Sequence, residues 1–352
     1  MKALSITATA EGTGKTAISL ALGRIAQDRG EAVGYMKPKG TRLQSRVGKI
    51  TDRDPELAIE VLDLDYQLEE LEPIVYSSRF IESAVRGQED PNELRHRIQA
   101  IFDQLAQGQD MMLVEGATNH TVGQIIDLTD PVIAEVLDSS VLLVATFERL
   151  DDLDGLLAAI DDIGDHLMGI LFNDVDDTAL DTLQRDAIPF LESRGHTVLG
   201  VLPHTRELAG VTIGELATDL GAKQLTSDKS DAFIERFLVG AMSGDTALRH
   251  FRRTRNAAVI TGGDRAEIHT AAIEAPGIEC LILTGGQRPP STIIGKAEEA
   301  GLSLLAVTID TLGAVEQAEE IVRSGRARDA KTVDRMRELL EAHADIEPIL
   351  AT

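Results

Sequence analysis

Cysteine is almost absent from this chain of 352 residues, in which Cys280 is the only one. A single thiol cannot form a disulfide within the chain, so the fold cannot rely on an internal disulfide framework. The amino-terminal stretch "MKALSITATA" lacks the charged, apolar and small-residue segments of a secretory signal. Both observations predict a cytoplasmic protein.

Long hydrophobic runs are also missing. No segment approaches the ~18 consecutive apolar residues that a membrane-spanning helix needs, so no membrane helix is expected. The hydrophobic content of 43% is nevertheless high enough for packed cores. A chain of this length is typical of two domains.

Positive charge is scarce. The chain has 34 Lys and Arg residues and 59 Asp and Glu residues, which gives a net charge of −25. Such a surface repels nucleic acid and anionic membranes, and neither is expected as a partner. Tryptophan is absent, and the acidic residues are spread along the chain. This composition favours a salt-adapted protein, and the alternative is an ordinary acidic cytosolic protein.

Apolar runs alternate with amphipathic segments over the first 210 residues. Helices are predicted at 16–30, 91–108 and 152–164. Nearly continuous apolar strands separated by helices indicate a parallel sheet covered on both faces. We therefore predict an α/β domain of the P-loop NTPase type over residues 1–210. Its expected strands are 3–9, 32–36, 111–116, 140–147, 167–173 and 197–202.

A smaller α/β domain is predicted over residues 211–325. Its strand candidates at 257–263, 279–286 and 302–308 are each followed by a turn and a helical pattern. Residues 326–352 contain one amphipathic helix, which caps the second domain or joins a dimer interface. Capping of the second domain is the favoured expectation.

The stretch "TATAEGTGKTAIS" at 7–19 has the pattern of a phosphate-binding loop between a strand and a helix. Backbone N–H groups of its turn and of the helix start can hold phosphate oxygens. The usual loop has a glycine where Thr9 stands, and Ala8 or Thr9 can replace it if φ stays negative. Lys15 supplies a charge for the β- and γ-phosphates and Thr16 a hydroxyl for Mg²⁺. The predicted nucleotide-binding residues of the loop are Glu11, Gly12, Thr13, Gly14, Lys15 and Thr16.

Two further polar features follow apolar strands. Lys37 and Lys39 in "GYMKPKGTR" alternate along an extended segment, so only one of them is expected to face the phosphate site. Glu115 ends the strand "MMLVE", at the sheet edge where a carboxylate can bind Mg²⁺ directly or through water. The alternatives are surface lysines on a turn and an ordinary loop carboxylate.

These residues carry a family resemblance. Residues 1–210 resemble the dethiobiotin synthetase group, which includes cobyrinic acid a,c-diamide synthases and an N-terminal domain of long phosphotransacetylases. The motifs that carry it are Gly14-Lys15-Thr16, Lys37-Pro38, Val114-Glu115-Gly116, Asn173 and "LGVLP" at 199–203. The phosphate loop of this group is one residue longer than the usual one, which would make Ala8 its first position.

The resemblance also implies roles. Lys37 would lie near the transferred phosphoryl group, Glu115 would bind Mg²⁺, and an aspartate from "TDRDPELA" would be a further ligand. Asp52 and Asp54 are both candidates for that ligand, and Asp54 is favoured. Asn173 would contact the base, and His204 and Thr205 would border it.

The chain departs from the synthetases beside the phosphate loop. They continue the Glu-Gly motif with Ala-Gly-Gly, whereas this chain has Ala117-Thr118-Asn119-His120. The segment Lys39-Gly40-Thr41 differs from their small, hydroxyl-rich continuation as well. The resemblance thus implies ATP (or GTP) and Mg²⁺ as cofactors and leaves the second substrate open.

Residues 211–325 resemble the DRTGG domain, which is associated with sensing or assembly. The corresponding residues are Asp264, Arg265, Thr284, Gly285 and Gly286, an expected effector site or subunit contact. Asp264 can N-cap the helix that follows it. The basic run "RHFRRTR" at 249–255 could bind an anion, with salt bridges to neighbouring acids as the favoured alternative.

Two functions remain open. The leading hypothesis is a Mg²⁺- and ATP-binding regulatory or scaffold protein linked to acetyl-CoA and acetate metabolism. It would form a homo-oligomer through the DRTGG domain and partner a separate acetyltransferase, without catalysing acetyl transfer by itself. The alternative is an ATP-dependent ligase in which Lys15 and Lys37 are catalytic and an acyl phosphate forms near Lys37.

Overall fold

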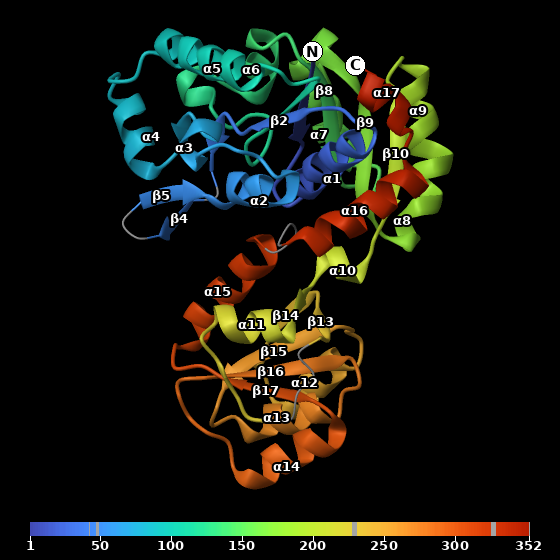
Figure 1. Ribbon diagram of the computed structural model, residues 1–352. Coiled ribbons are helices and arrows are strands. Elements are labelled where there is room, and N and C mark those ends of the chain that lie inside the picture. Colours follow the sequence, from blue (N-terminus) through green and yellow to red (C-terminus); the bar gives the residue numbers. More distant parts are fainter. Residues whose placement is uncertain (42, 47–48, 227–230, 325–328, 352) are drawn as a thin grey trace. The chain divides into compact units, whose positions relative to one another are not determined.

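The computed structural model describes residues 1–41, 43–46, 49–226, 231–324 and 329–351, which fall into two compact units (Figure 1). The first unit comprises Met1–Thr205 together with Ala327–Thr352, and the second comprises Arg206–Arg326. Along the sequence, the second unit is therefore inserted into the first.

The first unit is built on a six-stranded sheet in the order β10-β9-β8-β1-β7-β2, in which every neighbouring pair is parallel. Because helices cover both faces of such a sheet, its strands are apolar almost throughout. The register sets Ser5 beside Val114 and Ile6 beside Leu142, so the carboxyl ends of the central strands meet at one edge. The strands are β1 (Lys2–Ala8), β2 (Val33–Met36), β7 (Met111–Glu115), β8 (Ser140–Ala145), β9 (Leu167–Val175) and β10 (Val198–Pro203).

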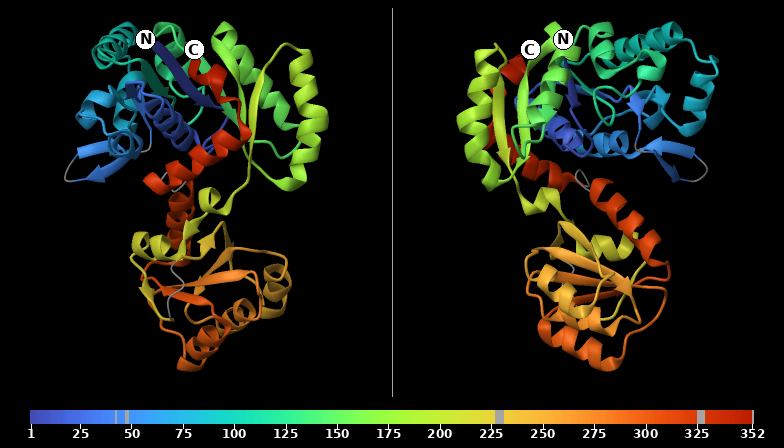
Figure 2. Two further views of the ribbon diagram at one scale, coloured as in Figure 1. Left: turned by 45° about the vertical axis from the view of Figure 1, so that its right-hand side comes forward. Right: turned by 180° about the vertical axis from the view of Figure 1, so that it is seen from behind.

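Helices lie on both sides of this sheet (Figure 2). A core cluster that includes Leu143, Leu156 and Leu191 joins β8 to the helices of one face, and the rings of Phe147 and Phe172 meet edge to face with centroids 6.1 Å apart. No helix among the described residues is both long and apolar enough to cross a membrane. The main helices are α1 (Lys15–Asp28), α2 (Arg53–Leu62), α5 (Pro91–Leu105), α6 (Asp130–Val136), α7 (Asp152–Ile163), α8 (Asp177–Thr182) and α9 (Ile188–Ser193).

Shorter elements surround the carboxyl edge of the sheet. β3 (Lys39–Gly40) pairs in parallel with β6 (Ile74–Val75), and β4 (Leu43–Arg46) forms an antiparallel pair with β5 (Lys49–Asp52). The remaining short segments are α3 (Leu68–Leu71), α4 (Ser78–Val85), η1 (Gln124–Ile126), η2 (Gly164–His166) and the π-helical turn η3 (Leu183–Ala187).

The second unit has a five-stranded sheet in the order β12-β17-β16-β15-β14. Its strands pair in parallel except β12 (Lys223–Gln224), which is antiparallel to its neighbour. Cys280 is fully buried in this sheet, and burial raises the pKa of its thiol. The other strands are β11 (Val211–Thr212), β13 (Phe233–Ile234), β14 (Arg236–Val239), β15 (Ala257–Gly262), β16 (Ile278–Thr284) and β17 (Ser303–Ala306). The helices are α10 (Arg206–Ala209), α11 (Ile213–Asp219), α12 (Gly244–Phe251), α13 (Ala266–Ile273), α14 (Ser291–Ala300) and α15 (Thr311–Ser324).

The C-terminal helices belong to the first unit, which corrects the expectation that they cap the second. α16 (Ala330–His343) packs along α1 and against β10 and α2, and α17 (Ile346–Ala351) follows it. An antiparallel bridge between Gly200 and Ala344, with a hydrogen bond of 2.7 Å from Asp345 N to Leu199 O, ties the end of α16 to β10. The amphipathic pattern predicted a buried face correctly but did not identify its partner.

Candidate nucleotide site

The phosphate loop has the predicted strand–turn–helix form. β1 ends at Ala8 and α1 begins at Lys15, with Gly14 at the N-cap in the left-handed region at φ 88°. A Cβ atom on Gly14 would collide with the side-chain amide of Asn173, so both conformation and space require glycine here. Neither Ala8 nor Thr9 has a positive φ, so the condition under which a small residue can replace the glycine is met.

The amino end of α1 is suited to an anion. Among the described residues, no side chain caps this helix. The N–H groups of its first turn therefore have no capping side chain to compete with a phosphate oxygen. Glu11 is exposed on the loop, whereas Thr13 is fully buried and its Oγ1 has no hydrogen-bond partner among the described residues.

Lys15 and Thr16 both turn inward from the first turn of α1. Lys15 is only 8% exposed, and its Nζ donates to the carbonyl oxygen of Thr118 at 2.9 Å. Burial lowers the pKa of this lysine, and nearby Glu115 opposes the shift. Thr16 Oγ1 donates to Glu115 Oε1 at 2.7 Å, which joins the helix start to the end of β7.

Lys37 lies at the centre of a buried carboxylate cluster. Its Nζ contacts Asp54, is 3.2 Å from an oxygen of Asp52 and is 3.4 Å from Glu115 Oε1. Burial alone would lower the pKa of Lys37, but the three carboxylates raise it above the usual lysine range. Asp52 also caps α2 by accepting a hydrogen bond from Asp54 N at 2.9 Å.

Glu115 connects this cluster to the phosphate loop. Its Oε1 accepts from Thr16 and its Oε2 accepts from the hydroxyl of Tyr35 at 2.9 Å. Burial raises the pKa of Glu115, which Lys37 partly counteracts. Burial, followed by the charge of Glu115, raises the pKa of Tyr35. Sequence reasoning missed Tyr35, although a hydroxyl inside an otherwise apolar strand was the signal for it.

A fourth carboxyl group, that of Glu72, borders the cluster. The side chain is 5% exposed, Oε2 accepts from Asp52 N at 3.0 Å, and Oε1 has no hydrogen-bond partner in the described part of the chain. Burial raises the pKa of Glu72 to about 7, while the hydrogen bond from Asp52 N opposes that shift. No sequence motif pointed to this residue.

The donors present fit a hard divalent cation bound together with phosphate. Thr16, Asp54 and Glu115 offer one hydroxyl and two carboxylates around Lys37. Within the described ranges, no three or more His, Cys, Asp and Glu side chains form a metal cage on their own. Mg²⁺ usually takes one or two carboxylates and completes its shell with water and phosphate oxygens, which suits this set.

Of the predicted base-side residues, Asn173 contacts the loop. Asn173 Nδ2 donates to Thr13 O at 2.8 Å and so supports the loop from β9. His204 Nδ1 is 2.7 Å from an oxygen of Asp174, which has the left-handed φ of 61°. Thr205 has a buried Oγ1 for which the described part of the chain offers no hydrogen-bond partner.

Lys39 does not join the cluster around Lys37. Its buried Nζ pairs with Asp130 at 3.1 Å and donates to the carbonyls of Val122 and Leu128, both at 2.5 Å. Burial lowers the pKa of Lys39, and Asp130 opposes the shift. The two lysines therefore pair with different carboxylates, and neither of them is a surface lysine.

In the second unit, the two Thr-Gly-Gly turns lie side by side at the carboxyl edge of the sheet. Gly262 pairs with Thr284, and Gly263 N donates to Thr284 O at 3.2 Å. Thr284 Oγ1 is 2.8 Å from Thr311 Oγ1, and Gly285 and Gly286 both have positive φ. The backbones of the two turns thus approach each other closely.

The expected cap of α13 is wrong. Arg265, not Asp264, stands at the N-cap, and no side chain accepts a hydrogen bond there. Asp264 is exposed, whereas Arg265 reaches back to Met242 O at 3.0 Å and to Glu267 at 3.3 Å. The turn after the two glycines extends one residue further than the sequence suggested.

The basic run at 249–255 precedes β15, at the opposite edge of the sheet from the Thr-Gly-Gly turns. Arg252, Arg253 and Arg255 are exposed and form no ion pair with the described carboxylates, so the favoured salt-bridge expectation is not met for them. A ligand at the turns would lie at the far end of the strands from these arginines.

Comparison with known proteins identifies both units. Residues 2–212, more than half of the chain, match the family model described as "AAA domain". The chain belongs to the AAA domain family. Residues 215–321 of this AAA-domain protein match the DRTGG domain. The predicted fold class, a parallel P-loop-type sheet followed by a smaller α/β DRTGG domain, is confirmed.

Curated relatives agree with the predicted resemblance. The AAA-domain protein is 26% identical over 364 residues to a phosphate acetyltransferase of Pseudomonas putida, which covers 98% of this chain and 51% of the relative. It is 35% identical over 121 residues to an ATP-dependent dethiobiotin synthetase BioD of Frankia casuarinae, covering 33% of this chain and 47% of the relative. The chain thus spans about half the length of these relatives.

Solved structures align more weakly. The MinD cell division protein of Aquifex aeolicus is 16% identical with a TM-score of 0.34, covering 59% of this chain and 84% of MinD. The CBS and DRTGG domains of a Clostridium perfringens pyrophosphatase, complexed with diadenosine tetraphosphate, are 17% identical with a TM-score of 0.29. That alignment covers 38% of this chain and 68% of the pyrophosphatase chain.

Proposed function

We propose that the first unit binds a nucleoside triphosphate with Mg²⁺, ATP being favoured over GTP. The observation that carries this proposal is that Lys15, Thr16 and Glu115 lie together at the amino end of α1. Thr16 donates a hydrogen bond to Glu115, and Lys15 donates one to the carbonyl oxygen of Thr118. Backbone N–H groups of residues 11–16 would hold the phosphates, and Lys15 would neutralise their charge. Asn173, His204 and Thr205 would border the base.

Metal binding is proposed at Thr16, Asp54 and Glu115. A bound Mg²⁺ would neutralise phosphate charge and polarise the phosphoryl group. The chain's own contribution is to keep these oxygens buried and oriented, since Glu115 is fixed by Thr16 and Tyr35. Lys37, which the carboxylates keep protonated, would stay available as a cation beside the phosphates.

The proposed role of this binding is regulatory or scaffolding, in acetyl-CoA and acetate metabolism. Support comes from the similarity to a phosphate acetyltransferase over 98% of this chain. The DRTGG domain would sense an effector or mediate homo-oligomer formation through Asp264, Arg265, Thr284, Gly285 and Gly286. A separate acetyltransferase is the proposed partner.

A second candidate is an ATP-dependent ligase, which the burial of Lys37 among carboxylates beside the phosphate loop favours. Lys37 and Lys15 would then stabilise phosphoryl transfer to a carboxylate or carbamate, and the acyl phosphate would react with an amine. The sequence similarity to dethiobiotin synthetases supports this second candidate. The departures at Thr118 and Asn119 argue for a different second substrate.

Calorimetric titration with ATP and Mg²⁺ tests the binding proposal. Lys15→Ala should abolish saturable binding, whereas Lys296→Ala, which removes an exposed lysine, should bind like the wild type. Absence of binding by the wild type in both dilute buffer and concentrated KCl would refute the proposal.

Product analysis separates the two roles. A regulatory protein should release little ADP whatever is added, whereas a ligase should release ADP only when a carboxylate and an amine are both present. ADP release that depends on both additions and disappears in Lys15→Ala would overturn the regulatory role.

A further inference from the structure

The loop between β7 and α6, residues 116–129, is anchored by a buried ion pair that the proposed nucleotide chemistry does not use. Lys39 is 1% exposed and Asp130 is 6% exposed. In the described part of the chain, the Lys39 ammonium contacts Asp130, Val122 O and Leu128 O, which matches its three N–H donors. The two carbonyls belong to the middle of the loop and to its far end, so this one side chain holds both places.

Asp130 holds the near half of the same loop. Its carboxylate accepts from Ala117 N at 3.1 and 3.2 Å and from Thr7 Oγ1 at 2.6 Å. A Cβ atom on Gly116 would collide with this carboxylate, so glycine after Glu115 gives the carboxylate its space. Both ends of the loop are thereby fixed to one buried pair of charges.

The anchored loop reaches the phosphate site through Thr118. Its carbonyl oxygen is the acceptor for Lys15 Nζ at 2.9 Å, and its hydroxyl donates to Thr41 Oγ1 at 3.1 Å. Thr118 follows directly after Ala117, whose N–H is held by Asp130. Displacement of Ala117 would therefore move the acceptor that positions the Lys15 ammonium.

We propose that Lys39 and Asp130 are positioning residues which hold loop 116–129 so that the Thr118 carbonyl keeps Lys15 ordered at the phosphate loop. The proposal rests on the proposed nucleotide binding. An ordered Lys15 loses little rotamer freedom when phosphate binds, whereas a free lysine side chain must be ordered at that moment. Nucleotide affinity thus depends on two residues that lie outside the phosphate loop.

The test uses Lys39→Met/Asp130→Asn in the full chain, because either single change would leave one buried charge without its partner. The matched control is Leu191→Ala, which removes buried core packing in the same unit away from the loop. Two quantities are measured: the dissociation constant for ADP with Mg²⁺, and hydrogen exchange of the amides of residues 117–129 without nucleotide.

The double variant should bind ADP about tenfold more weakly, the scale of ordering one long side chain. Its loop amides should exchange faster, while the control keeps both quantities within about twofold of the wild type. An unchanged dissociation constant, tighter binding or unchanged loop exchange in the double variant would overturn the inference. If the wild type binds no nucleotide, the proposed function fails and loop exchange alone decides whether the pair anchors the loop.

Discussion

The buried hydroxyl of Tyr35 is expected to affect the proposed metal site, although Tyr35 is not one of the proposed ligands. It donates to Glu115 Oε2, while Thr16 donates to Oε1, so the carboxylate is held from both sides. Removal of a hydrogen bond to a buried charged group costs about 1.5–3 kcal/mol. The orientation of Glu115 toward a metal should therefore depend on Tyr35.

Tyr35→Phe should reduce the enhancement of nucleotide binding by Mg²⁺ several-fold, because Glu115 loses the hydrogen-bond donor that fixes its Oε2. Dissociation constants measured with Mg²⁺ and with a chelator give this enhancement as a ratio. Tyr66→Phe is the control, since the Tyr66 hydroxyl donates to Leu105 O outside the cluster. Equal ratios for both variants would show that Tyr35 does not orient Glu115.

Glu72 predicts a pH dependence of stability. Its pKa is raised from 4.5 to about 7 in the folded chain, so between these values the folded state binds more protons than the unfolded state. The contribution of Glu72 to the free energy of unfolding should therefore be largest below pH 4.5 and should fall as the pH rises to about 7.

Glu72→Gln removes the titration, so the variant should lack this part of the decline. The expected difference between the pH slopes of the two proteins integrates to on the order of 3 kcal/mol. Urea unfolding across this pH range measures it. Parallel stability curves for the wild type and the variant would contradict the raised pKa.

Residue patterns predicted part of the candidate site and could not predict the rest. The loop at 11–16, Lys37, Glu115 and Asn173 lie together because each stands at or near the carboxyl end of a strand of one parallel sheet. Tyr35, Glu72 and the pairing of Lys39 with Asp130 depend on which distant segments meet. Alternation along the strand separated Lys37 from Lys39 but did not show where the second lysine was buried.

Among the elements, α16 was predicted well in extent and incorrectly in place. Its buried face includes Val333, Met336 and Leu340, and it packs along α1, the helix that begins with the phosphate loop. The helical periodicity of apolar residues predicted α1, α5 and α7. Such a periodicity indicates only that one face of a helix is buried, and does not identify the element that covers it. Strand β14 was not recognised, because a half-exposed edge strand lacks a clear period.

Leu340→Ala should destabilise the first unit by about 2–5 kcal/mol, because it leaves a cavity between α16 and its neighbours. Chemical unfolding followed by circular dichroism measures the change. Leu312→Ala makes the same substitution at a side chain that is 67% exposed and should change stability by less than about 0.5 kcal/mol. A small effect at Leu340 would mean that α16 is not part of this core.

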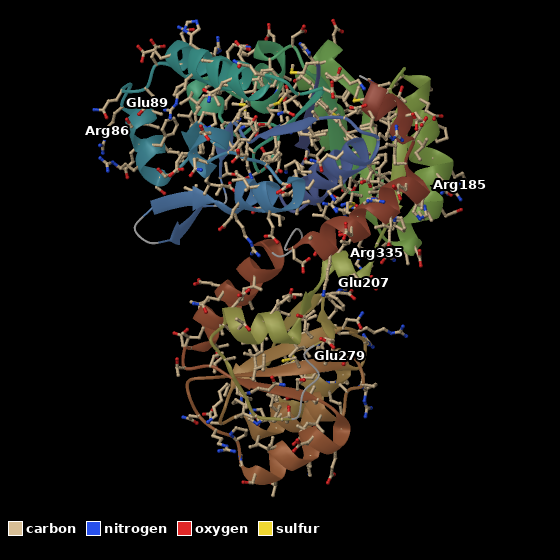
Figure 3. All side chains as sticks on the ribbon, in the orientation of Figure 1. Arg86, Glu89, Arg185, Glu207, Glu279 and Arg335 are labelled. Atoms are coloured by element: carbon tan, nitrogen blue, oxygen red, sulfur yellow. The ribbon has the colours of Figure 1, made fainter. Side chains whose placement is uncertain are left out.

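At the scale of the whole molecule, charge is the dominant property. Charged side chains extend from both units in Figure 3, among them Arg185, which pairs with Asp181 at 2.9 Å, and Arg335, which pairs with Glu338 at 2.6 Å. Exposed pairs of this kind contribute little to stability. The net charge of −25 therefore acts mainly as general repulsion.

Salt should stabilise this chain. Between about 0.1 M and 1 M KCl the Debye length falls from about 10 Å to about 3 Å, which screens the repulsion between carboxylates. Because urea is uncharged, the urea midpoint measured at each KCl concentration isolates the effect, and it should rise. A midpoint that is highest in dilute buffer would exclude salt adaptation.

The return of α16 to the first unit also affects how the protein is made. A ribosome releases the whole of Arg206–Arg326 before it releases the helix that completes the first unit. During synthesis, the second unit can finish folding while β10 and α1 still lack their cover. The unit that begins first is thus the one that is completed last, and its nucleotide loop stays on an incomplete core until then.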